Sequence, residues 1–133
     1  MTEAKVNMWL KYAMSDLKIA RLGMAYAKEE TAQICFHPQQ CVEKSLKAFL
    51  IHKNISFPKT HSIEYLYKNC KDIEPDFDNI DTGNLSSYAV ETRYPQDFVM
   101  PDLKEADDAY MTAKQIFSFI VKKLDSDQDL TLF

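Results

Sequence analysis

The sequence predicts an all-α protein, an up-and-down bundle of about four long helices plus one short helix. The 133 residues include only 2 glycines and 5 prolines, so the chain has little material for hairpin turns. Apolar residues recur in alternating steps of three and four near both ends of the chain, a pattern typical of amphipathic helices that pack side by side. A hydrophobic content of 46% is enough to build one core.

The first and last predicted helices each carry a long apolar stripe. The stripe of the first helix consists of Val6, Leu10, Ala13, Leu17, Ala20, Met24 and Ala27. The stripe of the last helix consists of Leu103, Ala106, Tyr110, Ala113, Phe117, Ile120 and Leu124. Pro101 and Asp102 favour a helix start directly after them. We expect a bundle domain over residues 1–124 and a frayed tail over residues 125–133.

Two long helices and a short one are predicted between these stripes. One long helix covers roughly residues 32–53, and Pro38 should kink it because proline removes a backbone hydrogen bond. A short helix around residues 63–70 follows, with Thr60 or Ser62 as its cap. Another helical run covers about residues 85–92 and ends at Tyr94, because the proline after it disfavours helical geometry.

Charge and cysteine content narrow the classes of function. A net charge of -4 and a pI near 5.3 argue against a broad basic surface, so any contact with nucleic acid must be local. The 3 cysteines form no CxxC pair and no leader segment is evident, which favours a reduced, cytoplasmic protein. No apolar segment approaches the ~20 residues that cross a bilayer, so we expect no membrane partner. Nothing in the sequence predicts a cofactor.

Four polar residues of the 32–53 helix share one face. Gln40, Glu43, Lys44 and Lys47 lie at i, i+3, i+4 and i+7, and we call them the polar ridge. Two interpretations stay open. The ridge is either a solvated face with an ordinary Glu43–Lys47 pair, or one wall of a phosphate pocket that it forms together with Arg93.

Three segments taken together resemble one known family. They read "CFHPQQCVEKSLKAFL" at residues 35–50, "KTHSIEYL" at 59–66 and "YAVETRYP" at 88–95. This combination resembles the HEPN domain family of prokaryotic and eukaryotic helical bundles, over essentially the whole chain. The resemblance implies a homodimer, often encoded beside a small nucleotidyltransferase. In some branches it implies a ribonuclease toxin of a toxin–antitoxin pair.

The predicted ligand site is centred on Arg93. The RNA-cutting branches of the HEPN family carry a histidine four to six residues beyond such an arginine, whereas residues 94–100 of this sequence contain none. Cleavage needs one group to accept the 2′-hydroxyl proton and another to protonate the leaving oxygen. We therefore expect phosphate binding rather than cutting, with Tyr94 either stacked on a base or buried. A cation at a helix C-terminus is also favoured without any function.

The remaining candidate side chains are read as structural. His61 is expected to cap a helix or to bond between helices, although it could also replace the missing proton carrier. Cys35, His37 and Cys41 lie on different faces of their helix, and no second cluster supplies further metal ligands, so no metal site is predicted.

Apolar residues beyond the needs of one bundle suggest a two-fold homodimer. These residues are Trp9, Tyr12, Met24, Tyr110 and Phe119. Three hypotheses for the function remain: a nucleotide- or RNA-binding module that works with a nucleotidyltransferase partner, a ribonuclease toxin with a substituted site at His61 or Tyr94, and a purely structural dimer.

Overall fold

The computed structural model describes residues 2–83, 85 and 100–127, and it confirms an all-α helical bundle. The structure contains α1 (Thr2–Tyr26), α2 (Thr31–His52), α3 (Ile63–Ile73), the 3-10 turn η1 (Pro75–Asn79) and α4 (Leu103–Asp127). Apart from Leu85, the helical run predicted at residues 85–92 lies outside the described residues.

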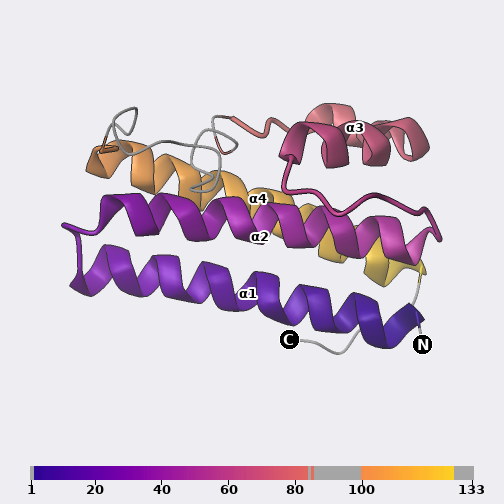
Figure 1. Cartoon of the computed structure of the whole chain (residues 1–133), viewed down its shortest axis with the longest axis horizontal. Helices are drawn as coiled ribbons and strands as arrows, with labels where there is room; N and C mark the ends of the chain where they lie inside the picture. Colours follow the sequence, from indigo (N-terminus) through magenta and orange to yellow (C-terminus); the bar gives the residue numbers. More distant parts are fainter. Residues whose placement is uncertain (1, 84, 86–99, 128–133) are drawn as a thin grey trace.

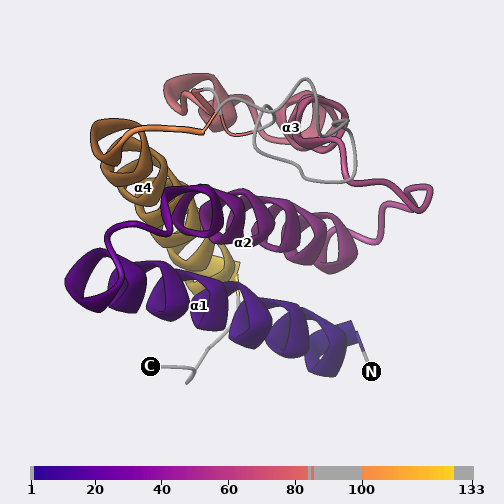
Figure 2. The same ribbon diagram turned by 60° about the vertical axis from the view of Figure 1, so that its left-hand side comes forward.

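Helix α2 is the central element of the bundle. It packs against α1, α4 and α3, whereas α1 and α4 share a smaller contact. Helix α1 runs antiparallel to α2 and to α4, and α3 covers the side of α2 away from α1 (Figures 1 and 2). Because α2 is covered on several sides, most of its side chains are buried whatever their polarity.

The predicted helix boundaries follow local capping. Ser62 accepts a hydrogen bond from the backbone N–H of Tyr65 at 3.2 Å and caps α3. Asp102 Oδ1 accepts from the Glu105 N–H at 2.7 Å, and Glu105 Oε1 accepts from the Asp102 N–H at 3.3 Å, which makes a reciprocal capping box. Helix α4 therefore starts where the sequence predicted, but it continues to Asp127, beyond the expected domain boundary at residue 124.

The expected interruption at Pro38 does not divide α2. The helix runs continuously from Thr31 to His52 with Pro38 inside it. Pro38 is the eighth residue of the helix and so lies in its third turn. It removes one backbone hydrogen bond, and the tertiary contacts of this central helix offset that loss.

Phe77 of η1 ties the middle of the chain to the bundle. Its buried ring meets Phe49 of α2 at 4.9 Å and Phe119 of α4 at 5.1 Å between centroids, both edge to face. The Tyr67 hydroxyl of α3 donates to the Phe77 carbonyl oxygen at 2.6 Å. One residue of a short turn thus joins three helices.

Four of the five apolar residues that were expected to form a dimer interface pack against the core instead. Trp9, Met24, Tyr110 and Phe119 are partly buried and pack against it, and only Tyr12 is largely exposed, at 56%. The sequence overestimated the number of apolar residues outside the core. A long apolar stripe on a helix predicts that one face is buried, but it does not predict how wide that buried face is.

Candidate functional site

The polar ridge forms a compact network around Glu43. Lys47 Nζ donates to Glu43 Oε1 at 3.0 Å, and His61 Nδ1 lies 2.7 Å from the same oxygen. Gln39 and Gln40 each place Nε2 3.5 Å from Glu43 Oε2. Glu43 is only 3% exposed, so its carboxylate accepts hydrogen bonds from protein groups in place of water.

Lys44 belongs to a second network, centred on Asp16 of α1. Its Nζ donates to Asp16 Oδ2 at 2.7 Å, and His37 Nδ1 lies 2.8 Å from Asp16 Oδ1. The Asp16 side chain is 8% exposed. The ring of Tyr12 lies beneath Lys44, with the ammonium 5.8 Å from its centroid. Asp16 of α1 is therefore in contact with both Lys44 and His37 of α2.

Glu43 and Lys47 of the ridge face the interior of the bundle, whereas Gln40 and Lys44 are half-buried, so the ridge is not a fully solvated face. Lys47 is 7% exposed and lies 5.4 Å from the centroid of the Trp9 ring of α1. The expected pair between Glu43 and Lys47 exists, but it is buried rather than an ordinary surface pair. Both ridge lysines are thus neutralised by carboxylates, which leaves little attraction for an external phosphate.

His61 makes the predicted bond between elements. Its ring is 54% exposed and reaches from the segment before α3 to Glu43 of α2. This contact fastens the α2–α3 connection to the central helix. Arg93 and Tyr94, the other two predicted ligand residues, lie outside the described residues.

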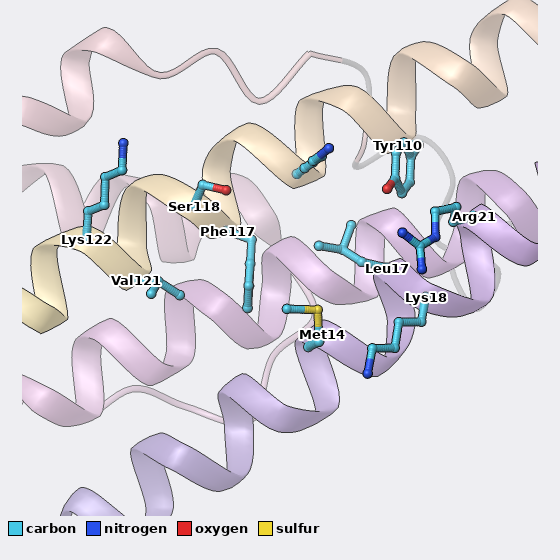
Figure 3. Close-up of a pocket in the computed structure, with 10 residues that line it drawn as sticks. Met14, Leu17, Lys18, Arg21, Tyr110, Phe117, Ser118, Val121 and Lys122 are labelled. Carbon is cyan, nitrogen blue, oxygen red and sulfur yellow. The ribbon is translucent and has the colours of Figure 1, made fainter. Parts of the chain in front are cut away.

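A groove of about 420 Å³ opens between α1 and α4 (Figure 3). Its apolar lining is formed by Met14, Leu17, Phe117 and Val121, and its polar lining by Tyr110 and Ser118. Four exposed cations complete it, Lys18, Arg21, Lys114 and Lys122. In Figure 3 Phe117 and Val121 of α4 lie across from Met14 and Leu17 of α1, with Tyr110 and Arg21 near one end of the groove and Lys122 near the other.

The described charged side chains that line the α1–α4 groove are all positive. None of its described lining residues is acidic, and none of its four cations forms an ion pair with a described residue. Such a concave surface with one sign of charge concentrates oppositely charged ligands. Lys123, the neighbour of the groove residue Lys122, instead pairs with Glu74 and Asp76.

Sequence reasoning missed the α1–α4 groove, although a signal was present. Lys18 and Arg21 flank the apolar stripe of α1 three residues apart, and Lys114 and Lys122 flank the stripe of α4 eight residues apart. Both spacings place two cations on the same side of a helix. Only the packing of α1 against α4 shows that the two basic borders face one opening.

The thiols of two buried cysteines are poor nucleophiles. Burial raises the pKa of Cys70 to about 12, and burial raises the pKa of Cys41 well above its ordinary value despite a contact with Ser45. Among the described residues no group of three or more His, Cys, Asp or Glu side chains could hold a metal ion. Within the same part of the chain, no helix has both the length and the apolar character needed to cross a membrane.

The chain belongs to the HEPN domain family, whose model matches residues 6–124. An archaeal HEPN homologue, ST0689, is similar to it in structure, with a TM-score of 0.67, 26% identity, and coverage of 89% of this chain and 96% of that one. TT1696 from Thermus thermophilus shares the fold, with a TM-score of 0.68, 23% identity, and coverage of 90% of this chain and 98% of that one. No curated protein matches the sequence significantly.

Proposed function

We propose that this HEPN protein is a binding module for a nucleotide or for RNA and that it works with a small nucleotidyltransferase partner. The observation that carries the binding proposal is the α1–α4 groove, with four cations and no acid among its described lining residues. This location differs from the polar ridge, whose lysines are already paired with carboxylates.

The chemistry of the groove fits the two parts of a nucleotide. The half-buried Met14 offers an apolar surface on which a base can lie, and the half-buried Tyr110 offers an aromatic ring at the edge of the groove. Arg21 can hold two phosphate oxygens with its planar fork, and the lysines act as point charges. The volume of the groove lies at the lower end of the range of about 300–1,000 Å³ that is usual for small-ligand sites.

Binding is proposed rather than cutting because the described lining residues include no side chain that exchanges protons near neutral pH. Arg93 and Tyr94 remain proposed contacts for the same ligand. The alternative is a ribonuclease toxin of a toxin–antitoxin pair. In that case His61, oriented by the Glu43 carboxylate, would be the proton carrier, as an imidazole held by an acid is in other enzymes.

A two-fold homodimer is a further part of the proposal. Exposed apolar side chains occur at the start of α4, where Met100 is 61%, Leu103 40% and Met111 44% exposed. The charges between them are mostly acidic, with Asp102, Glu105 and Asp107 beside Lys104, which pairs with Asp108 at 3.0 Å. A two-fold contact there would place Lys104 of one copy against an acid of the other.

Fluorescence anisotropy with a labelled single-stranded RNA and with a labelled nucleoside triphosphate tests the binding proposal. The double variant Lys18→Gln/Lys114→Gln should weaken binding at least about tenfold, because two phosphate contacts are lost. The matched control Lys59→Gln/Lys68→Gln removes the same charge from exposed positions outside the groove and should change binding less than about twofold.

Salt dependence gives a second readout on the same RNA. With at most four groove cations engaged, the logarithm of the affinity should fall with the logarithm of salt concentration with a slope no steeper than about -3. Equal weakening by the two double variants would contradict the groove as the binding site. RNA cleavage that His61→Ala abolishes would replace the binding proposal with the toxin alternative.

A further inference from the structure

Helix α1 has a second apolar stripe on the side away from the core. Its members are exposed to between 46% and 85%, namely Met8, Tyr12, Ile19, Leu22 and Tyr26. With Ser15 at the remaining position, the steps are four, three, four, three and four, which is the spacing of a coiled-coil seam. No described element covers this outer stripe.

Cations border the outer stripe of α1. Lys11 and Lys18 lie seven residues apart and therefore on one border, and Lys5 lies near the other. All three are exposed, whereas the exposed acid of α1 is Glu3 at its first turn and Asp16 is buried in ion pairs. One border of the outer stripe is thus positive, at Lys11 and Lys18, whereas the other carries Lys5 and, next to Ile19 and Leu22, the acid Glu30.

We propose that the outer stripe of α1 is a docking surface for a protein partner that presents an amphipathic helix with acidic borders. Helices with seams of this spacing pack at a small crossing angle, and charges beside the seam decide which helices pair. Acidic residues beside the partner's seam would face Lys11 and Lys18 and attract them.

The same charges disfavour a second copy of this chain on the outer stripe. In a two-fold antiparallel pair, equivalent borders face one another, so Lys11 and Lys18 of one copy would face the lysines of the other. The proposed homodimer surface at the start of α4 is mostly acidic and is a different region. A lipid surface fits less well, because the seam is narrow and Ser15 interrupts its centre.

This docking surface adjoins the α1–α4 groove but does not depend on nucleotide binding. Lys18 borders the seam and also lines the groove, so a helix docked on α1 would lie beside any ligand bound there. Because Lys11 and Leu22 do not line the groove, substitutions at these two positions separate the docking proposal from the binding proposal.

Two designed helical peptides test the docking proposal by fluorescence anisotropy. Both peptides carry leucine in a four-three seam, one with glutamate and the other with lysine at the bordering positions. We expect the glutamate peptide to bind the native protein about fivefold or more tightly than the lysine peptide, since several facing charge pairs each add a small attraction. Leu22→Ser should weaken this binding about tenfold, whereas Met111→Ser, an exposed apolar change on α4, should leave it unchanged.

The charge reversal Lys11→Glu should lower the preference for the glutamate peptide without affecting RNA binding. Equal binding of both peptides, or binding that Leu22→Ser does not alter, would overturn the docking proposal. So would two other results of Leu22→Ser: loss of self-association, which assigns the stripe to a second copy, or loss of binding to vesicles of anionic phospholipid, which assigns it to a membrane. A loss of RNA affinity confined to the Lys18→Gln/Lys114→Gln variant would leave the docking proposal intact.

Discussion

Lysines occur in two regions of this protein under opposite conditions. In the interface between α1 and α2, Lys44 and Lys47 are covered by aromatic rings and each donates to a buried carboxylate. In the α1–α4 groove, Lys18 and Lys114 are exposed and pair with no described acid. A lysine whose charge is already neutralised inside a bundle supports the fold, whereas a lysine at an open apolar groove can bind a phosphate.

The largest expected effect is on the interior network. Glu43→Ala leaves the buried Lys47 ammonium without its carboxylate and should lower the free energy of unfolding by about 3–5 kcal/mol. The matched control is Asp108→Ala, which breaks the exposed pair with Lys104 and should cost less than about 1 kcal/mol. Urea denaturation measures both, and similar losses in the two variants would mean that burial does not distinguish the two pairs.

A smaller effect is expected at Gly23 of α1, which packs directly against Ile34 of α2. A Cβ at Gly23 would lie 2.7 Å from Ile34 Cγ1, a buried atom that cannot swing into solvent. Gly23→Ala should therefore destabilise the protein by about 1–3 kcal/mol, although alanine favours a helix by about 1 kcal/mol relative to glycine. The control Ala25→Gly, at an exposed position of the same helix, measures only the difference in helix propensity between alanine and glycine. A gain in stability for Gly23→Ala would show that the interface adjusts freely.

The pH dependence of the interior gives the smallest effect near neutral pH. Burial raises the pKa of Cys70 to about 12, so the neutral thiol is favoured in the folded state relative to the unfolded one. Its contribution to stability is complete below the ordinary pKa of 9.0 and is lost as the pH rises from there towards 12. Iodoacetamide should label Cys70 at about pH 8 much more slowly in the native protein than in urea. Equal labelling rates would contradict the burial.

The sequence predicted most of the helices because their signals are local. The stripes of α1 and α4, the cap at Ser62 and the start after Asp102 depend on residues within a few positions of one another. It did not predict that the polar ridge is interior, because the periodicity of α2 does not reveal that α1 covers its polar face. Asp16, a lone acid beside the apolar stripe of α1, was the available clue.

The groove depended on tertiary packing as well. Neither Arg21 nor Lys114 was predicted as a site residue, since neither position is distinctive within its own helix. The two residues come together only because α1 packs antiparallel against α4, which places the cations of both helices around one groove. Pairing between distant helices is the step that residue spacing alone does not provide.

The central claim is that the groove lysines bind ligand and the interior lysines do not. It is tested most directly by the anisotropy of one labelled RNA titrated with Lys18→Gln/Lys114→Gln and with Lys44→Gln, each first shown to be folded by circular dichroism. We predict that the groove variant loses at least about tenfold in affinity, because its phosphate contacts are removed, and that Lys44→Gln stays within about twofold of the native protein. A tenfold loss in Lys44→Gln with native affinity in the groove variant would contradict this prediction and place the ligand at the polar ridge.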